Sequence, residues 1–232
     1  RGLHNLRERH RGSVVTIGNY DGVHRGHQHM LAAVRGHAKR LGVPATVITF
    51  EPTPREFFEG GTAPSRLMRL REKVEALPLY GVDRMVVLRF DRRMQGMGAQ
   101  EFVERLLVQG LGVQHMVVGH DFHFARRREG TIATLREAGA RHGFEVQEVG
   151  QFLVDGERVS SSLVREALGR GDLARAEQLL GRPYRMAGRV RRGQQLGRKL
   201  GYPTANLKTD CLLPADGVYG GAAMLPDGRE VP

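Results

Sequence analysis

Short apolar runs alternate with amphipathic stretches along most of the chain. Residues 13–17 and 44–50 are apolar runs of strand length. Between them lie a polar segment, 18–27, and a stretch whose apolar side chains recur at helical spacing: Met30, Leu31, Val34, Ala38 and Leu41. Gly42 follows, where a helix commonly ends. The pattern predicts a βαβ unit with the right-handed crossover that parallel strands take.

The same alternation continues to residue 180. It predicts further strands over residues 84–90, 115–119 and 144–149, and helices over 66–77, 99–109, 130–142, 161–169 and 172–180. In the helix 66–77 we expect Leu67, Leu70, Val74 and Leu77 to form the buried face. Such alternation is typical of an α/β fold. We therefore predict a sheet of five parallel strands.

The pattern changes after residue 182. Helical periodicity ends and glycines become frequent, which favours a β-rich second domain over residues 183–232 after a first domain of residues 1–182. About 50 residues are too few to close a barrel of several strands. Because the chain also begins without methionine, we expect the sequence to be part of a longer protein.

Cysteine content and apolar runs indicate the compartment. Cys211 is the single cysteine, so an internal disulfide is impossible and a reducing environment is favoured. No apolar run approaches the roughly 20 residues of a membrane span. Residues 1–11 are charged and lack the apolar stretch of a secretion signal. We expect a cytoplasmic protein without a membrane partner.

The net charge of +11 raises the possibility of nucleic-acid binding. However, only four of the 36 basic residues are lysines, and the arginines are spread along the chain instead of gathered on one segment. The densest run, residues 126–128, has no interleaved aromatic side chains for base stacking. We predict small polyanionic ligands and no nucleic-acid partner.

The segment GNYDGVHRGH, residues 18–27, combines two histidines with the start of a helix. Ligands of parallel sheets bind beyond the carboxyl ends of the strands, and free N–H groups at a helix start favour anions. His24 and His27 are one helical turn apart and Gly26 permits a close approach, so the segment could hold a triphosphate. Alternatively, both histidines are ordinary turn and cap residues. Metal binding is less favoured, because no further ligands follow at useful spacing.

A second segment, RVSSSLVR, spans residues 158–165. Serines at a helix start are common capping residues. Alternatively, Ser161 or Ser162 contacts ATP together with Arg165, one turn into the helix.

Together these segments resemble the His-x-Gly-His and Ser/Thr-x-x-Arg motifs of nucleotidylyltransferases. With TFEPTP (49–54) and VVGHDF (117–122), they are similar to the FAD synthetase module, and GRKLGYPTAN (197–206) resembles the signature of riboflavin kinase. The order of the motifs resembles the bacterial bifunctional riboflavin kinase/FAD synthetase family. The resemblance implies a Rossmann-like nucleotidylyltransferase domain with a parallel sheet, followed by the start of a β-barrel riboflavin kinase domain.

The resemblance also implies site residues. It assigns catalytic roles to His24, His27, Ser162 and Arg165. ATP-binding residues would be these four with Gly18, Asn19, Tyr20, Asp21, Gly22, Asp121, Arg158 and Ser161, and Asp21, Asp121 and Arg158 would place the nucleotide or its Mg²⁺. Flavin-binding residues would be Phe50, Pro52, Pro54 and Phe57.

In the kinase module the matching positions are Gly197, Arg198, Gly201, Thr204 and Asn206. Thr204 and Asn206 alternate, so on an extended chain both face one side, where a hydroxyl and an amide oxygen suit Mg²⁺. Alternatively, this segment is a turn around Pro203 with buried polar groups. The chain departs from the family at Tyr20, where phenylalanine is usual, and at residues 125–128, ARRR, where a glycine-rich segment is usual.

The resemblance implies transfer of AMP from ATP to FMN, giving FAD and pyrophosphate, with Mg²⁺ as cofactor. A full-length parent would also phosphorylate riboflavin with ATP. The family's catalytic glutamate follows the kinase motif beyond residue 232, so we expect no riboflavin phosphorylation by this chain alone. The alternatives are a related nucleotidylyltransferase with another phosphorylated acceptor and a non-catalytic nucleic-acid-binding module. The sequence gives no oligomeric state.

Overall fold

The computed structural model describes residues 2, 5–199, 201–202, 204–209, 211–213 and 215–231, with the side chains of residues 196 and 198 left out. Its centre is a sheet of five strands: β1 (Ser13–Ile17), β2 (Ala45–Phe50), β3 (Arg84–Leu88), β4 (Val113–Gly119) and β5 (Glu145–Val149). Their order is β3-β2-β1-β4-β5, and every neighbouring pair is parallel. The predicted α/β fold and parallel sheet are confirmed.

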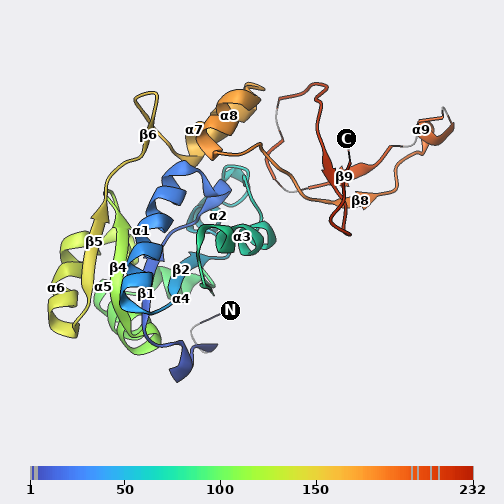
Figure 1. Ribbon diagram of the computed structural model, residues 1–232. Coiled ribbons are helices and arrows are strands. Elements are labelled where there is room, and N and C mark those ends of the chain that lie inside the picture. Colours follow the sequence, from blue (N-terminus) through green and yellow to red (C-terminus); the bar gives the residue numbers. More distant parts are fainter. Residues whose placement is uncertain are drawn as a thin grey trace.

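Helices cover both faces of this sheet (Figure 1). Val14 of β1 packs with Val34 and Ala38 of α1 (Arg25–Leu41) on one face. Val15, its neighbour, packs on the other face with Leu106 and Leu135, which belong to the helix over residues 99–111 and to α6 (Ile132–His142). Neighbouring β1 residues are thus buried on opposite faces, as expected for a parallel sheet between helical layers.

Several predicted helices have different ends or geometry. The helix predicted over 66–77 begins only at Leu70 (α3, Leu70–Ala76). Its burial is also different: Val74 is half exposed, whereas Lys73 is 1% exposed. The helix predicted over 99–109 is present as α5 (Ala99–Phe102) and continues as a π-helix over Val103–Leu111.

Two short helices and a hairpin within residues 54–158 were not expected from the sequence. The TFEPTP segment continues into α2 (Pro54–Glu59), α4 covers Arg92–Gly96, and β6 (Leu153–Val154) pairs with β7 (Glu157–Arg158) in a hairpin. The hairpin leads into α7 (Ser161–Gly169), which packs against α8 (Leu173–Leu180). These two helices match the prediction closely.

The unusual ARRR segment has the backbone that a glycine would favour. Ala125, Arg127 and Arg128 all have positive φ, and Ala125 lies at φ 65°, ψ −172°. That combination is a region occupied almost entirely by glycine. The departure from the family pattern at this segment is therefore accompanied by backbone strain.

The last part of the chain forms short antiparallel pairs. β8 (Arg189–Arg191) pairs with β9 (Asn206–Lys208), β10 (Ala223–Met224) pairs with β11 (Glu230–Val231), and α9 spans Leu196–Lys199. Figure 1 shows β8, β9 and α9 extending away from the first domain.

Leu212 and Ala215 nevertheless lie against the first domain. The Leu212 N–H donates to the Arg66 carbonyl at 2.7 Å, and the Ala215 N–H donates to the Leu168 carbonyl at 3.0 Å. The Tyr184 hydroxyl donates to the Leu212 carbonyl at 2.8 Å. Tyr184 and Leu212 also pack on the apolar cluster of α7 and α8. Hydrogen bonds and apolar contacts therefore join the second part of the chain to the first domain beside α3.

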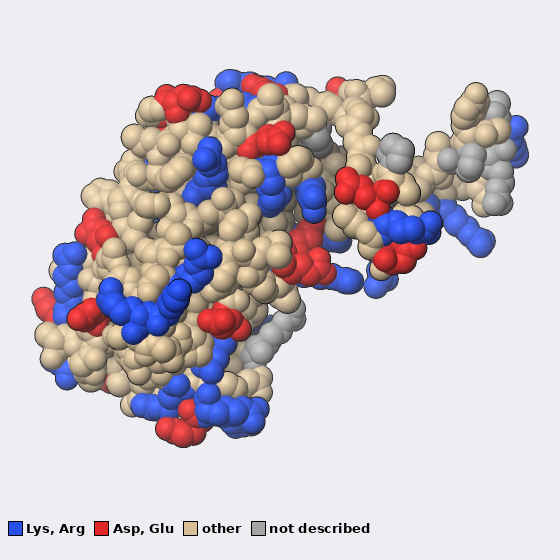
Figure 2. All heavy atoms as spheres, viewed as in Figure 1, with Lys and Arg blue, Asp and Glu red and all other residues tan. Residues whose placement is uncertain are grey.

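On the face drawn in Figure 2, basic and acidic side chains are interspersed. Among the described helices, none combines the length and apolarity required to cross a membrane.

Candidate active site

A hollow of about 240 Å³ lies where β1 and β4 end. The chain leaves these neighbouring strands in opposite directions along the sheet, and ligands of open α/β sheets bind at such a point. We call it the histidine hollow. Its lining residues are Ile17, Gly18, Tyr20, His24, Gly26, His27, Met30, Gly119–Phe122, Val149–Phe152 and Arg158–Ser161.

His24 and His27 stack in this hollow, with ring centroids 3.6 Å apart. His24 is the N-cap of α1, and its Nδ1 accepts the His27 N–H at 3.3 Å. The His24 proton is therefore on Nε2. Gly26 fits because a Cβ there would lie 3.2 Å from His24 Nδ1 and from the Val159 carbonyl. The capping interpretation is thus correct for His24, and it is compatible with a place in the site.

Both imidazoles are neutral at neutral pH. Burial lowers the pKa of His24 to about 4, helped by the charges of Arg158 and Arg165. Burial also lowers the pKa of His27 well below its ordinary value, with smaller contributions from His24 and Lys73. His27 Nδ1 is buried without a hydrogen-bond partner within the described part of the chain. The pair can therefore offer hydrogen bonds to a ligand, but no positive charge.

Other predicted ATP-binding residues surround the pair. Tyr20 is 1% exposed, and its hydroxyl bonds to Thr16 Oγ1 at 2.8 Å, so its ring forms the floor. Asp121 and Arg158 form an ion pair of 2.9 Å between the end of β4 and the hairpin. Both side chains are about half exposed, so they can meet a ligand at the rim.

A second hollow, of about 170 Å³, lies beside the first, and we call it the arginine hollow. Its lining residues are Asn19, Asp21, Thr53, Arg55, Glu56, Ala63, Pro64, Arg66, Lys73, Ser161, Ser162 and Arg165. Ser161 lines both hollows. The structure therefore distributes the predicted ATP-binding residues over two adjoining spaces, with Asn19, Asp21, Ser162 and Arg165 in the second.

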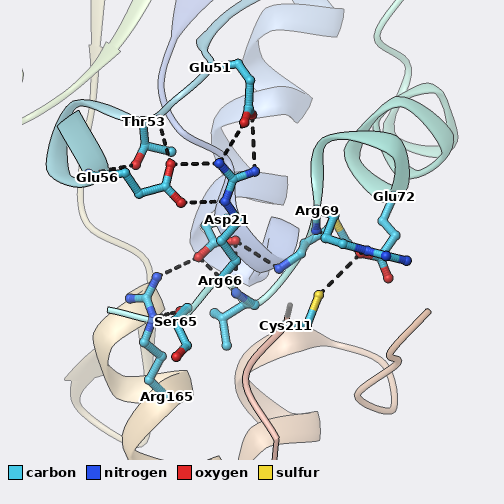
Figure 3. Close-up of polar contacts among 12 residues, drawn as sticks. Asp21, Glu51, Thr53, Glu56, Ser65, Arg66, Arg69, Glu72, Arg165 and Cys211 are labelled. Atoms are coloured by element: carbon cyan, nitrogen blue, oxygen red, sulfur yellow. Dashed lines mark hydrogen bonds and ion pairs between the residues drawn. The ribbon is translucent and has the colours of Figure 1, made fainter. Parts of the chain in front are cut away.

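Asp21 is the anchor of the arginine hollow (Figure 3). Its carboxylate accepts the N–H groups of Leu67 and Met68 at 3.0–3.1 Å and the Arg165 guanidinium at 2.5 Å. Arg165 also donates to the Ser65 carbonyl at 2.8 Å. Both Asp21 oxygens are thus engaged, and the carboxylate positions Arg165 and the segment before α3.

The three serines at the start of α7 have different contacts. Ser160 is the cap of α7, accepting the Leu163 N–H at 3.2 Å. Ser161 donates to the Asp21 carbonyl at 3.0 Å, and Ser162 lines the arginine hollow. Gly22 lines neither hollow. It has φ 81°, and a Cβ there would lie 2.9 Å from a Leu67 methyl group. Glycine at this position therefore allows the 18–27 segment to pack closely against Leu67.

Sequence reasoning missed a charged cluster at the far side of the arginine hollow. Arg66 pairs with Glu51 at 2.7 Å and with Glu56 at 2.5 Å (Figure 3). Glu56 also completes a capping box with Thr53 at the start of α2. A T-P-R-E sequence at positions 53–56 is a recognisable helix start, and this signal could have revealed α2.

The four predicted flavin-binding residues lie beside this cluster, and none of them lines either hollow. Phe57 packs edge-on against Phe58 and Phe90, and Phe50 packs against Phe90. Pro52 precedes α2 and Pro54 is its first residue. The group supports α2, whose Thr53 and Glu56 face the arginine hollow.

Two of the predicted kinase residues, Thr204 and Asn206, pack closely against Gly197 and Gly193. A Cβ on Gly193 would overlap the Asn206 amide, and one on Gly197 would overlap the Tyr202 carbonyl and contact the Thr204 hydroxyl. Asn206 begins β9 opposite Arg191, whereas Thr204 precedes the strand. Gly201 has φ 82° in open space. The side chain of Arg198, and Pro203, lie outside the described residues.

The chain matches two family models: FAD synthetase over residues 6–163 and riboflavin kinase over residues 180–232. It is 54% identical to the bifunctional riboflavin kinase/FMN adenylyltransferase of Pseudomonas fluorescens over 94% of this chain and 70% of that protein. The chain belongs to this bifunctional family. A second member, from Haemophilus influenzae, is 45% identical over 99% of this chain and 75% of that protein.

A further member, from Escherichia coli strain K12, is also 45% identical, over 94% of this chain and 71% of that protein. Among solved structures, one from Streptococcus pneumoniae described as a macrolide-efflux protein superposes with a TM-score of 0.83. It is 27% identical and covers 99% of this chain and 80% of that one. The bifunctional arrangement inferred from the motifs is thus confirmed by the family models and the sequence relatives.

Proposed function

We propose that residues 1–182 transfer AMP from ATP to FMN, producing FAD and pyrophosphate, and that residues 183–232 belong to a module that phosphorylates riboflavin. Membership of the family supports both activities. The observation that carries the first is the pair of adjoining hollows at the carboxyl edge of the sheet. Each is smaller than the roughly 300–1000 Å³ of a site that encloses a whole drug-sized ligand, so each suits part of a substrate pair.

The histidine hollow would receive ATP. A phosphate oxygen of FMN attacks the α-phosphorus of ATP in line, the bond from this phosphorus to the oxygen leading to the β-phosphorus breaks, and pyrophosphate leaves. The attacking phosphate is already anionic, so the step requires no general base. Phosphoryl transfer of this kind depends on positioning and charge stabilisation.

The residues of the chain supply both. His24 donates from Nε2, and the His27 ring, which stacks on His24, lines the same hollow. Arg165 supplies positive charge from a position that Asp21 and the Ser65 carbonyl fix. Arg158 adds charge at the rim. In this proposal the histidines act as preorganised dipoles and the arginines act as cations.

Mg²⁺ is the cofactor we propose for both modules, where it would neutralise charge on the ATP phosphates. Asp21 does not fit as its ligand, because both carboxylate oxygens are engaged. Asp121, with its half-exposed carboxylate, fits, and so do the oxygens of Thr204 and Asn206 in the second module. The described residues contain no cluster of three or more acidic, histidine or cysteine side chains for an ion. This agrees with Mg²⁺ that is held largely by substrate phosphates.

We further propose that the partners are small nucleotides and flavins, not nucleic acids or membranes, and that the protein is cytoplasmic. The spread of the arginines along the chain and the interspersed charges on the face drawn in Figure 2 support small ligands, and the single cysteine supports a reducing compartment.

Pyrophosphate release with ATP and a panel of acceptors tests the function. We expect turnover with FMN and none with pantetheine phosphate or nicotinate mononucleotide, and no cytidylyl transfer from CTP. Turnover with another acceptor alone would identify a different nucleotidylyltransferase. Salt-dependent oligonucleotide binding without pyrophosphate release would favour the nucleic-acid module.

A further inference from the structure

Lys73 is a buried cation for which the chain provides no close anion. It lies on α3, is 1% exposed, and lines the arginine hollow. Within the described residues its ammonium makes no hydrogen bond and no ion pair. The carboxylates of Asp21, Glu51 and Glu56 attract it from a greater distance, and burial lowers its pKa. A buried ammonium is costly unless an anion compensates for the lost water.

The nearby carboxylates already form ion pairs with arginines. Arg66 is shared by Glu51 and Glu56, so this end of the hollow carries more negative than positive charge. Asp21 is paired with Arg165, and Lys73 adds a second cation at that end. The arginine hollow is therefore polarised, and its positive end suits a phosphate.

Lys73 lines the arginine hollow, which adjoins the histidine hollow at Ser161. Its charge acts on Asp21 in the arginine hollow and on His27 in the histidine hollow. Asp21 binds the N–H groups of Leu67 and Met68, just before α3, and α3 packs against the turn that contains Asp21. The same carboxylate that fixes Arg165 thus fixes the helix that carries Lys73.

We propose that the Lys73 ammonium binds the phosphate of the acceptor and holds it at the junction of the two hollows, opposite the α-phosphorus of ATP. This inference rests on the proposed adenylyl transfer to FMN. It makes Lys73 the residue that distinguishes a phosphorylated flavin from riboflavin. The negative end at Glu56 then faces the hydroxyl groups of the ribityl chain, which can donate hydrogen bonds to it.

The test compares Lys73→Met with the unaltered chain and with Lys39→Met, which removes the same charge from an exposed position near the end of α1. Methionine fills the space of the buried stem, so we expect the melting temperature of Lys73→Met to be equal or higher. In FMN adenylylation, the KM for FMN should rise about 10- to 100-fold, the effect of losing a charged hydrogen bond. The KM for ATP should change little, and Lys39→Met should behave as the unaltered chain.

Riboflavin, which has no phosphate, supplies the decisive readout as a competitive inhibitor of FMN in the same reaction. Its inhibition constant should be the same in Lys73→Met and in the unaltered chain. An unchanged KM for FMN, or an equal rise in the KM for FMN and the inhibition constant for riboflavin, would overturn the role of Lys73. So would a rise confined to the KM for ATP. Absence of FMN-dependent pyrophosphate release by the unaltered chain would instead overturn the proposed function, and this inference with it.

Discussion

The two histidines of the 18–27 segment show how one residue serves both fold and chemistry. His24 caps α1 with Nδ1 and thereby fixes its own proton on Nε2. His27 stacks on the His24 ring, neutral and with a buried Nδ1 that has no partner among the described residues. Their spacing could be predicted from the sequence. Their neutrality could not, because it follows from desolvation in the folded chain and from charges distant in sequence, such as Arg158 and Lys73.

His27→Ala should lower kcat for FMN adenylylation by about 10²-fold or more, because one preorganised dipole at the phosphates is lost. The ring is partly buried and stacks on His24, so the free energy of unfolding should also fall, by roughly 1 kcal/mol. Steady-state kinetics and urea denaturation measure the two effects. His142→Ala, at the exposed end of α6, is the control and should retain full activity. Normal turnover by folded His27→Ala would refute the phosphate-contact role.

Ala125 tests the strained ARRR segment. Because its φ and ψ lie in a region almost exclusive to glycine, Ala125→Gly should raise the free energy of unfolding by about 1 kcal/mol. Ala133→Gly, at an exposed position inside α6, should lower it by about 1 kcal/mol. Urea denaturation of both variants gives the comparison. A loss of stability in Ala125→Gly would mean that the segment is not strained.

At the scale of elements, periodicity predicted the structure wherever local pattern and tertiary packing agree. The β1–α1–β2 unit and helices α7 and α8 are such cases. The start of α3 is not, because Leu67 and Met68 give their N–H groups to Asp21, 46 and 47 residues earlier in the chain. The pattern also assigned Val74 to the buried face, where the structure places Lys73. Contacts of this range leave no local signal.

The candidate site was only partly predictable for the same reason, the lack of a local signal for long-range contacts. The residues of both motifs could be named from sequence, but not their division between two hollows, which depends on the ion pair of Asp21 with Arg165 across the domain. The π-helical hydrogen bonding over Val103–Leu111 likewise follows from packing, since its residues read as an ordinary amphipathic helix. Periodicity gives no signal for the burial of Lys73 on α3, because it lies between the expected apolar positions Leu70 and Val74.

Helix α2 gives a prediction at this scale. Phe57→Ala removes the ring that packs α2 against Phe90, and should loosen Thr53 and Glu56 at the arginine hollow. FMN binding should weaken by roughly 1–2 kcal/mol, the worth of an aromatic contact, and ATP binding should be nearly unchanged. Separate titrations of the two ligands check this. Equal weakening for both would mean that α2 supports the whole site.

At the scale of the whole molecule, the predicted boundary at residue 182 falls within a packed region. The cluster formed by Leu67, Leu168 and Leu180 is covered in part by Tyr184 and Leu212, which follow that boundary. Backbone hydrogen bonds lie in the same contact region, which we call the seam: the Leu212 N–H donates to the Arg66 carbonyl, and the Ala215 N–H donates to the Leu168 carbonyl. The two parts of the chain thus share an apolar cluster beside the arginine hollow.

A chain cut after residue 182 should lose about 2–4 kcal/mol of unfolding free energy, the contribution of two partly buried apolar side chains. A chain cut after residue 216 keeps both and is the matched control. Chemical denaturation of the two chains provides the measurement. Equal stability would mean that the seam contributes little.

The same seam bears on how the first module would behave as a separate domain. Without Tyr184 and Leu212, the outer side of the α7–α8 cluster becomes an apolar strip on the surface. Exposed apolar strips on small domains promote self-association. The shorter fragment should therefore sediment as a mixture of species at concentrations where the longer one is uniform. The tendency of the first module to self-associate would then depend on Tyr184 and Leu212, two side chains that lie outside its own motifs.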